Sequence, residues 1–147
     1  MTIRCEIVSQ DRTVFAGDVD IVVLPGAGGE MGILPKHAPV LTTLKPGVIK
    51  VRVSGKEDLY AVAGGVAEVQ PDIVTILADR GSENIQDIDV DRAEAAKKRA
   101  EEYFSKNPPV DTDRYLIMEA ALRRANLRLD VVRRYRKSGM RTQESDN

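Results

Sequence analysis

The sequence contains few of the side chains from which disulfide frameworks, metal centres and aromatic stacking surfaces are built. Its 147 residues include one cysteine, one histidine and no tryptophan, and aromatic residues make up 4%. A single cysteine, Cys5, excludes a disulfide within the chain and is typical of a reducing compartment. Cys5 and the one histidine, His37, are too few for a His/Cys metal cluster, so we expect no metal site.

Long apolar runs are also missing. No segment approaches the roughly 20 consecutive apolar residues that a bilayer-spanning helix needs. The chain starts in an alternating apolar pattern, with Ile3, Cys5 and Ile7, rather than in a signal or transit peptide. We therefore expect the chain to stay in the compartment where it is made, and to reach a membrane only through partners.

Charge is distributed unevenly along a chain whose net charge is −1. Residues 1–87 carry 8 basic and 12 acidic side chains, and residues 88–113 carry 5 and 7. Residues 114–137 have eight Lys or Arg side chains and two acids, Glu119 and Asp130, a net charge of +6. Such asymmetry indicates an association surface rather than a fold, so the basic segment is expected to bind a partner.

The first 87 residues predict a β domain. Short apolar stretches recur every 8–12 residues or so between glycine and proline turns, which is typical of a β-sandwich or barrel. Within residues 14–24 we place Val19, Ile21 and Val23 on one face of a strand. The expected strands are 3–7, 14–24, 40–53, 59–63, 66–69 and 73–78.

The segment 24–39 is dense in glycine and proline and predicts tight turns. It is not a phosphate-binding P-loop, because no Lys-Ser/Thr pair follows its glycines and no helical pattern opens there. His37 has no nucleophile or carboxylate arranged with it in sequence. One alternative nevertheless stays open, a small β-sandwich enzyme whose active site lies in residues 28–39 and uses His37.

Two helices follow the β domain. Helical periodicity begins after Asp89, a suitable N-cap, and ends at Asn107-Pro108-Pro109. Asp111 or Thr112 can cap the second helix. Because the connection is short, the two helices are expected to form an antiparallel hairpin.

The facing stripes of this hairpin are built mainly from alanine. Alanine allows the helices to approach closely but buries little area. Burial of apolar area stabilises by roughly 25 cal/mol per Å², so the gain is small. We therefore expect a hairpin that is held weakly and can open. The stripes comprise Ala93, Ala96 and Ala100 in the first helix and Ala120, Ala121 and Ala125 in the second, which also carries Leu116, Leu127, Val131 and Tyr135 on one side.

These patterns predict an α+β chain in two segments. Residues 1–87 form an N-terminal β-sandwich or barrel of short strands. Residues 88–137 form a C-terminal antiparallel two-helix hairpin. Residues 138–147 are expected to be a flexible tail.

Several segments together resemble one known family. The most specific is GEMGILPKHAP at residues 29–39, followed by LKPG at 44–47; AGGVAEV at 63–69 and VTILA at 74–78 also match. With the order of β domain and alanine-rich hairpin, they resemble the epsilon subunit of bacterial F-type ATP synthases over essentially the whole chain.

The resemblance implies a non-catalytic rotor subunit in the central stalk of a proton-translocating ATP synthase. Such a subunit is peripheral, lies at the cytoplasmic face of the bacterial plasma membrane, and has no membrane span and no required cofactor. The family's β domain binds the gamma subunit and sits on the ring of c subunits. The resemblance assigns c-ring or gamma contact to Glu30 and His37, in a loop expected to face that ring.

The resemblance also implies a regulatory role for the hairpin. In this family the two C-terminal helices switch between a folded hairpin and an extended form that enters the alpha/beta hexamer and blocks ATP hydrolysis. The basic segment would then meet an acidic loop of the beta subunit. The implied beta contacts are Arg123, Arg124, Arg128, Arg133 and Arg134.

Some bacterial members also bind ATP in the folded hairpin, through a motif that appears here as IDVDRA at residues 88–93. ATP would be a regulatory ligand. In the other interpretation Asp89 only caps its helix, and the arginines face solvent or the beta subunit. A basic residue of the ATP-binding members is replaced by Leu116-Ile117, and the linker around Pro108-Pro109 is longer. The implied ATP-binding residues are Glu83, Ile88, Asp89, Arg92, Ala93, Arg99, Arg124 and Arg128.

A second alternative class is a nucleic-acid-binding protein that uses the basic helix. It predicts salt-sensitive binding to DNA. The acidic β domain and the scarcity of aromatic residues argue against it, so no nucleic-acid partner is expected.

Overall fold

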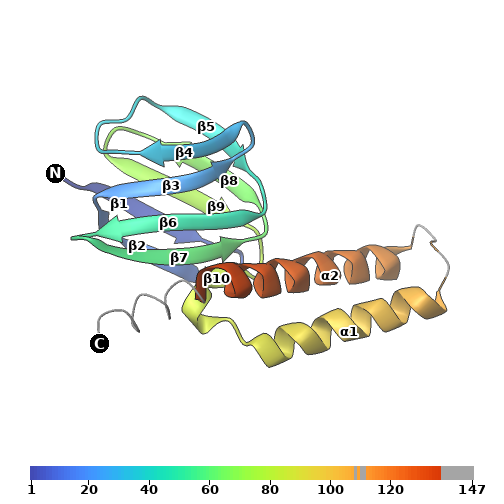
Figure 1. Cartoon of the computed structure of the whole chain (residues 1–147). Helices are drawn as coiled ribbons and strands as arrows, with labels where there is room; N and C mark the ends of the chain where they lie inside the picture. The colour runs from blue at the N-terminus through green and yellow to red at the C-terminus, as the bar shows by residue number, and fades with distance from the viewer. Residues whose placement is uncertain (108, 110–111, 137–147) are drawn as a thin grey trace, which may run out of the picture. The chain divides into compact units, whose positions relative to one another are not determined.

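A computed structural model describes residues 1–107, 109 and 112–136. The chain divides into two compact units, Met1–Asn84 and a second that begins at Ile85 (Figure 1). Asp111 and the predicted tail at 138–147 lie outside the described residues. Across the described part of the chain, no helix combines the length and the apolar character that crossing a membrane requires.

The first unit is a β domain whose strands are joined by short turns. All neighbouring strands pair antiparallel except β1 and β9, which are parallel. The strands are β1 (Ile3–Val8), β2 (Thr13–Val19), β3 (Ile21–Gly26), β4 (Gly29–Ile33), β5 (Val40–Leu44), β6 (Gly47–Val53), β7 (Lys56–Val62), β8 (Gly65–Val69), β9 (Ile73–Ala78) and β10 (Glu83–Asn84).

The strands form one strongly curled sheet. Their order is β10-β7-β6-β3-β5-β8-β9-β1-β2, and β4 pairs with the free side of β3. The sheet folds over so that β2 returns to β6 and β7, where the rings of Phe15 and Tyr60 lie 5.6 Å apart. The result is a nearly closed, flattened barrel in two layers (Figure 1), which confirms the predicted β-sandwich or barrel.

Alternating apolar residues fill the space between the two layers. In β1 the side chains of Ile3, Cys5 and Ile7 are fully buried, while their neighbours face outward. Ile73–Ala78 lies inside the sheet, between β8 and β1, as its β-branched run predicts. Burial raises the pKa of the Cys5 thiol to about 12, so this cysteine is a core residue rather than a reactive thiol.

The expected single strand at 14–24 is in fact two strands that meet at Asp20. The Asp20 amide donates to the Arg52 carbonyl at 2.8 Å, and its carboxylate accepts from the Ser54 amide at 2.8 Å. These bonds tie the break to the β6–β7 turn. That turn has two residues, Ser54 and Gly55, with φ of 52° and 81°, which suits a hairpin of type I′.

The break at Asp20 also changes which side chains face the core. Val22 and Leu24 are fully buried, whereas Ile21 and Val23 are only half-buried. Placing Val19, Ile21 and Val23 on one face of a strand was therefore wrong. A shift of one position moves every side chain to the other face of a strand, and the bend introduces that shift.

The second unit contains the helical hairpin. A short 3₁₀ turn, η1 (Ile85–Asp87), precedes α1 (Val90–Lys106); α2 (Asp113–Val131) follows and ends in a π-helical turn, η2 (Val132–Arg136). Asp89 caps α1 by accepting from the Arg92 amide at 3.1 Å. Thr112 caps α2 by accepting from the Tyr115 amide at 3.2 Å. The two helices run antiparallel (Figure 1), which confirms the predicted hairpin.

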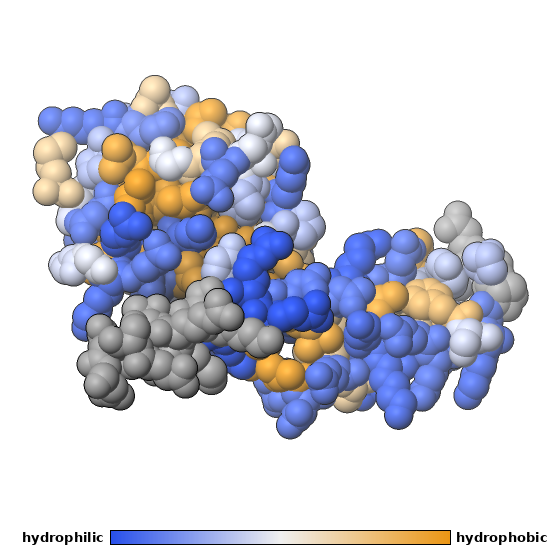
Figure 2. All heavy atoms as spheres, in the orientation of Figure 1, coloured by the Kyte–Doolittle hydropathy of each residue, from blue (hydrophilic) through white to orange (hydrophobic). Residues whose placement is uncertain are grey.

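Small residues form most of the interface between α1 and α2. Ala93, Ala100, Ala125 and Val131 are buried, and the face of the hairpin seen in Figure 2 is mostly hydrophilic with a few apolar patches. The prediction that Leu116 joins this seam is wrong, because its side chain is 51% exposed.

Aromatic side chains occupy the end of the hairpin where Leu116 was expected. The rings of Phe104 and Tyr115 lie 5.0 Å apart, and those of Tyr103 and Phe104 lie 5.6 Å apart. These edge-on contacts fill the space between the helices beside the connection. The next residue of α2, Leu116, is therefore turned outward.

Candidate functional site

The basic residues of α2 and η2 differ in exposure and in their partners. Arg123 forms an ion pair with Glu119, with 3.3 Å between Nη1 and Oε1, and both side chains are largely exposed. Such a pair contributes about 0.3–0.5 kcal/mol, so a partner's carboxylate can readily replace Glu119. Arg133 and Arg134 are exposed on η2, whereas Arg124 and Arg128 are half-buried on α2.

The residues implied for ATP differ in their burial and in the unit that carries them. Ile88 and Ala93 are buried, with 3% of each residue exposed, so neither presents its side chain at the surface. Asp89, Arg92 and Arg99 are exposed on the hairpin. Glu83, another residue implied for ATP, belongs to the first unit, where it lies on β10 opposite Ala61.

Asp89 has a definite structural task. One oxygen of its carboxylate accepts the Arg92 amide, and its own carbonyl accepts the Ala93 amide at 3.0 Å. The helix cap is therefore formed without any ligand, and the other carboxylate oxygen stays available at the exposed surface. The capping role is confirmed, while ATP binding by this motif stays a prediction.

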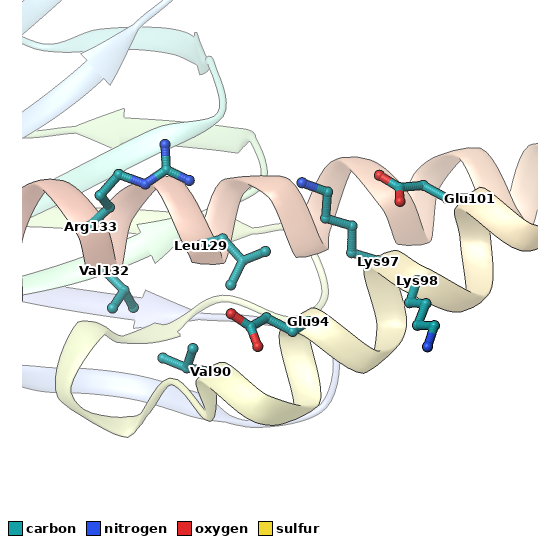
Figure 3. A pocket seen from close by; sticks show the side chains of 8 residues that line it. All are labelled: Val90, Glu94, Lys97, Lys98, Glu101, Leu129, Val132 and Arg133. Carbon is teal, nitrogen blue, oxygen red and sulfur yellow. The ribbon is translucent and has the colours of Figure 1, made fainter.

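A pocket of about 420 Å³ opens along one flank of the α1–α2 seam (Figure 3). Val90 and Val132 point toward one another at its base, and Lys97 extends from α1 toward α2, whereas Lys98 points away. None of the lining residues belongs to the set implied for ATP. They are Val90, Glu94, Lys97, Lys98, Glu101, Leu129, Val132 and Arg133.

Helical geometry places the implied ATP residues on the opposite flank. With 3.6 residues per turn, Arg92 and Arg99 share a side of α1 that is about half a turn from the side of Glu94 and Lys97. In the same way, Arg124 and Arg128 lie on the side of α2 away from Leu129 and Arg133. The hairpin therefore has one flank with four arginines from both helices, and another that carries the pocket.

Four guanidinium groups on one flank can bind a polyanion. Each guanidinium offers a planar fork of donors that matches phosphate oxygens, and like-charged arginines repel one another until an anion lies between them. Among the described residues no group of three or more His, Cys, Asp and Glu side chains could hold a metal ion.

Glu30 and His37 do not share a loop. Glu30 is exposed on β4, next to the β3–β4 turn, where it pairs with Pro25. His37 lies beyond the other end of β4, and its Nδ1 is 2.7 Å from the carbonyl oxygen of Ala38. The expected single loop is wrong, because Gly29–Ile33 continues the sheet. A partner surface that contacts both residues must span β4.

An exposed apolar face on the β domain was not predicted from the sequence. Leu41, Val66 and Leu77 stand on the neighbouring strands β5, β8 and β9, with 72%, 37% and 59% of each side chain exposed. Val66 on β8 pairs with Leu77 on β9. On its other side it pairs with Thr43 of β5, so Leu41, two residues from Thr43, is its diagonal neighbour. Apolar residues gathered on one face mark protein interaction sites. Strict alternation of apolar and polar residues in β9 would have marked Leu77 as facing outward. Because the run is almost continuously apolar, the sequence does not show which of its residues face outward.

Comparison with known proteins gives consistent results over both units. The beta-sandwich domain of the ATP synthase delta/epsilon chain matches residues 2–83, and the long alpha-helix domain of that chain matches residues 86–133. The chain is 43% identical to the ATP synthase epsilon chain of Dehalococcoides mccartyi (strain CBDB1), over 92% of this chain and 95% of that one. It is 42% identical to the epsilon chain of Acidithiobacillus ferridurans, over 95% and 96%.

A solved structure agrees with this relationship. A chain in the cryo-EM structure of the Euglena gracilis mitochondrial ATP synthase, OSCP/F1/c-ring, superposes with a TM-score of 0.69 at 25% identity, over 89% of this chain and 81% of that one. The resemblance carried by residues 29–39 and the following segments is thereby confirmed, and the enzyme alternative built on His37 is not retained. The chain belongs to the ATP synthase delta/epsilon chain family, whose members are non-catalytic stalk subunits of F-type ATP synthases.

Proposed function

We propose that this chain is a rotor subunit that couples gamma to the c-ring and inhibits ATP hydrolysis through its C-terminal hairpin. It would act as a peripheral subunit at the cytoplasmic face of a bacterial plasma membrane. One observation carries the inhibitory part. The hairpin joins a thin seam of small residues to a strongly basic outer surface, so little energy holds it closed and a large charge favours a partner.

The magnitudes support an equilibrium that a partner can shift. Burying the methyl groups of Ala93, Ala100 and Ala125 and the side chain of Val131 contributes together about 4–5 kcal/mol, as an upper estimate. An exposed ion pair contributes about 0–1 kcal/mol. Several arginines in a partly desolvated acidic site would offset the seam by a few kcal/mol, which is the difference a switch requires.

The proposed beta-subunit contacts suit this role in unequal degrees. Arg133 and Arg134 are exposed in the closed hairpin, and Arg123 has only a weak internal partner, Glu119. These three can begin an encounter with an acidic loop before the hairpin opens. Arg124 and Arg128 are half-buried, so opening would expose them further.

The β domain offers two kinds of surface for the stalk. We assign the apolar face of Leu41, Val66 and Leu77 to the gamma subunit, because a permanent rotor contact should bury apolar area. The polar end that carries Glu30 is exposed and suits the c-ring. His37 lies beyond the far end of β4 and would contact a different part of the partner surface.

Truncation tests the proposal. A chain that ends at Asp87 retains the whole β unit and should still bind gamma in a pull-down, and the c subunits should be recovered with it. The assembled complex with this chain should hydrolyse ATP faster than the complex with the full chain. A double variant, Leu41→Asp with Leu77→Asp, should lose gamma, whereas Lys56→Asp, in the exposed β6–β7 hairpin, should not. Equal hydrolysis by both complexes would contradict inhibition.

A regulatory nucleotide site on the arginine flank is the finer part of the proposal. An ATP molecule held between Arg92 and Arg99 of α1 and Arg124 and Arg128 of α2 would bridge the two helices. It would stabilise the closed form by RT ln(1 + [L]/Kd), about 2.7 kcal/mol at a hundredfold excess over Kd. ATP would thereby oppose inhibition when it is abundant.

Adjacent residues on α1 provide a matched test of this site. Arg99→Ala and Lys98→Ala each remove one positive charge from an exposed position, but Arg99 lies on the arginine flank and Lys98 lines the pocket. Isothermal titration with MgATP should give binding that Arg99→Ala weakens about tenfold and Lys98→Ala leaves unchanged. Asp89→Asn, which keeps the cap acceptor, separates ligand binding from helix capping. The absence of a binding heat at millimolar MgATP would contradict the proposed nucleotide site.

A further inference from the structure

The side chain of Arg136 makes an unusual set of contacts at the end of the hairpin. Its Nη2, with two N–H groups, lies within hydrogen-bond distance of three backbone carbonyl oxygens, those of Ile85 at 2.8 Å, Gln86 at 3.1 Å and Ile88 at 2.7 Å, so one hydrogen is shared between two of them. All four residues belong to the second unit. One guanidinium thus joins the last turn after α2 to the segment that precedes α1.

The three carbonyls need a donor that the backbone does not fully supply. They lie ahead of the N-cap Asp89, so no α-helical amide four residues later reaches them. The Ile88 amide reaches the Ile85 carbonyl at a long 3.3 Å. Ile85 and Ile88 are almost fully buried, and carbonyls beside buried side chains are costly to leave unpaired. Arg136 is the side chain that pairs them.

The backbone of α2 changes form where Arg136 is needed. Val132–Arg136 forms a π-helical turn instead of continuing the α-helix. A π turn is wider than an α turn, so it changes the direction in which the following side chains point; such turns are rare and are frequently found at functional sites. Here its last residue is the one that reaches η1, which indicates that the π turn serves to place Arg136.

We infer that Arg136 is the latch of the closed hairpin. Opening α2 away from α1 must break all three of its bonds, while the alanine seam alone offers little resistance. Its role in regulation rests on the proposed function, since a latch matters only if the hairpin opens.

Arg133 provides a control on the same turn. It is exposed on η2, and its side chain forms no hydrogen bond or ion pair with another residue in the described part of the chain. Arg133→Ala therefore removes the same charge as Arg136→Ala without touching the carbonyls. Arg136→Lys keeps the charge but places it on a shorter, flexible stem, as a compact ammonium in place of the planar guanidinium.

Amide hydrogen exchange on the isolated full-length chain tests the latch. In Arg136→Ala the amides of α1 and α2 should exchange about tenfold faster than in Arg133→Ala, because bonds from a charged donor are lost. Arg136→Lys should lie between Arg136→Ala and the unchanged chain. The amides of the β strands should exchange equally in all four chains.

Two results would overturn the latch. One is equal exchange of α1 and α2 in Arg136→Ala and Arg133→Ala. The other is faster exchange in the β strands of Arg136→Ala, which would indicate a general loss of stability. Neither result depends on an assembled ATP synthase. The proposed inhibition can therefore fail in the hydrolysis assay while the latch holds, and the latch can fail while truncation still raises hydrolysis.

Discussion

Replacing Ala100 by leucine changes the seam of the hairpin at its tightest point. The Ala100 side chain is fully buried between the helices, at 0% exposure, so three additional carbon atoms have no space. Overpacking of this kind costs about 1–3 kcal/mol. Since the four buried seam residues contribute about 4–5 kcal/mol, the substitution should remove a large part of that contribution.

Hydrogen exchange measures this effect segment by segment. In Ala100→Leu the amides of α2 should exchange about 5- to 150-fold faster, while the β strands keep their protection. The matched control is Ala95→Leu, at an exposed position of the same helix where leucine is a good helix former. If Ala100→Leu and Ala95→Leu exchange alike, or if the β strands lose protection first, the account of a thin independent seam is refuted.

Three further predictions concern single residues. Cys5 should resist a thiol reagent at about pH 8 in the folded chain, because its pKa is raised to about 12, and should react at once in denaturant. Above about pH 9 the free energy of unfolding should fall, because the thiol ionises in the unfolded chain before it does in the folded one. Thr112→Ala should lower the free energy of unfolding of the hairpin by about 0.5–2 kcal/mol, because the helix cap is lost, whereas Thr112→Ser should not; thermal unfolding followed by circular dichroism measures this. Gly65→Ala should lower the free energy of unfolding of the β domain, measured in urea, by about 1–3 kcal/mol or more. Its φ is +148°, and an added Cβ would lie 2.3 Å from the Leu77 carbonyl oxygen. The control, Gly28→Ala, should be neutral, because a Cβ there meets no atom within 4 Å.

Features of the fold that depend on local sequence could be predicted. The alternation of Ile3, Cys5 and Ile7 places a strand and its core face, and Asp89 and Thr112 occupy the caps that their side chains suit. Proline after Asn107 fixes the end of α1, because it disfavours a helical residue before it. In each case the deciding interaction lies within a few residues of the chain.

Features that depend on distant backbone groups could not be predicted. The break at Asp20 is held by the Ser54 amide, which is 34 residues away in sequence. The partners of Arg136 are backbone carbonyls 48–51 residues earlier, and a carbonyl leaves no mark in a sequence. The outward turn of Leu116 follows from aromatic rings at the end of the hairpin, which occupy its place. Helical periodicity alone assigns a side to a residue but does not decide what already fills that side.

The hydrolysis rate of the assembled complex tests the central claim most directly when the hairpin is loosened rather than removed. Complexes carrying the unchanged chain, Ala100→Leu, Ala95→Leu and the chain that ends at Asp87 would be compared at equal subunit content. The account predicts slower hydrolysis with Ala100→Leu than with the unchanged chain, no change with Ala95→Leu, and the fastest hydrolysis with the truncated chain. Hydrolysis that stays the same or rises with Ala100→Leu, although exchange shows its hairpin to be open, would contradict the claim that the open hairpin is the inhibitory form.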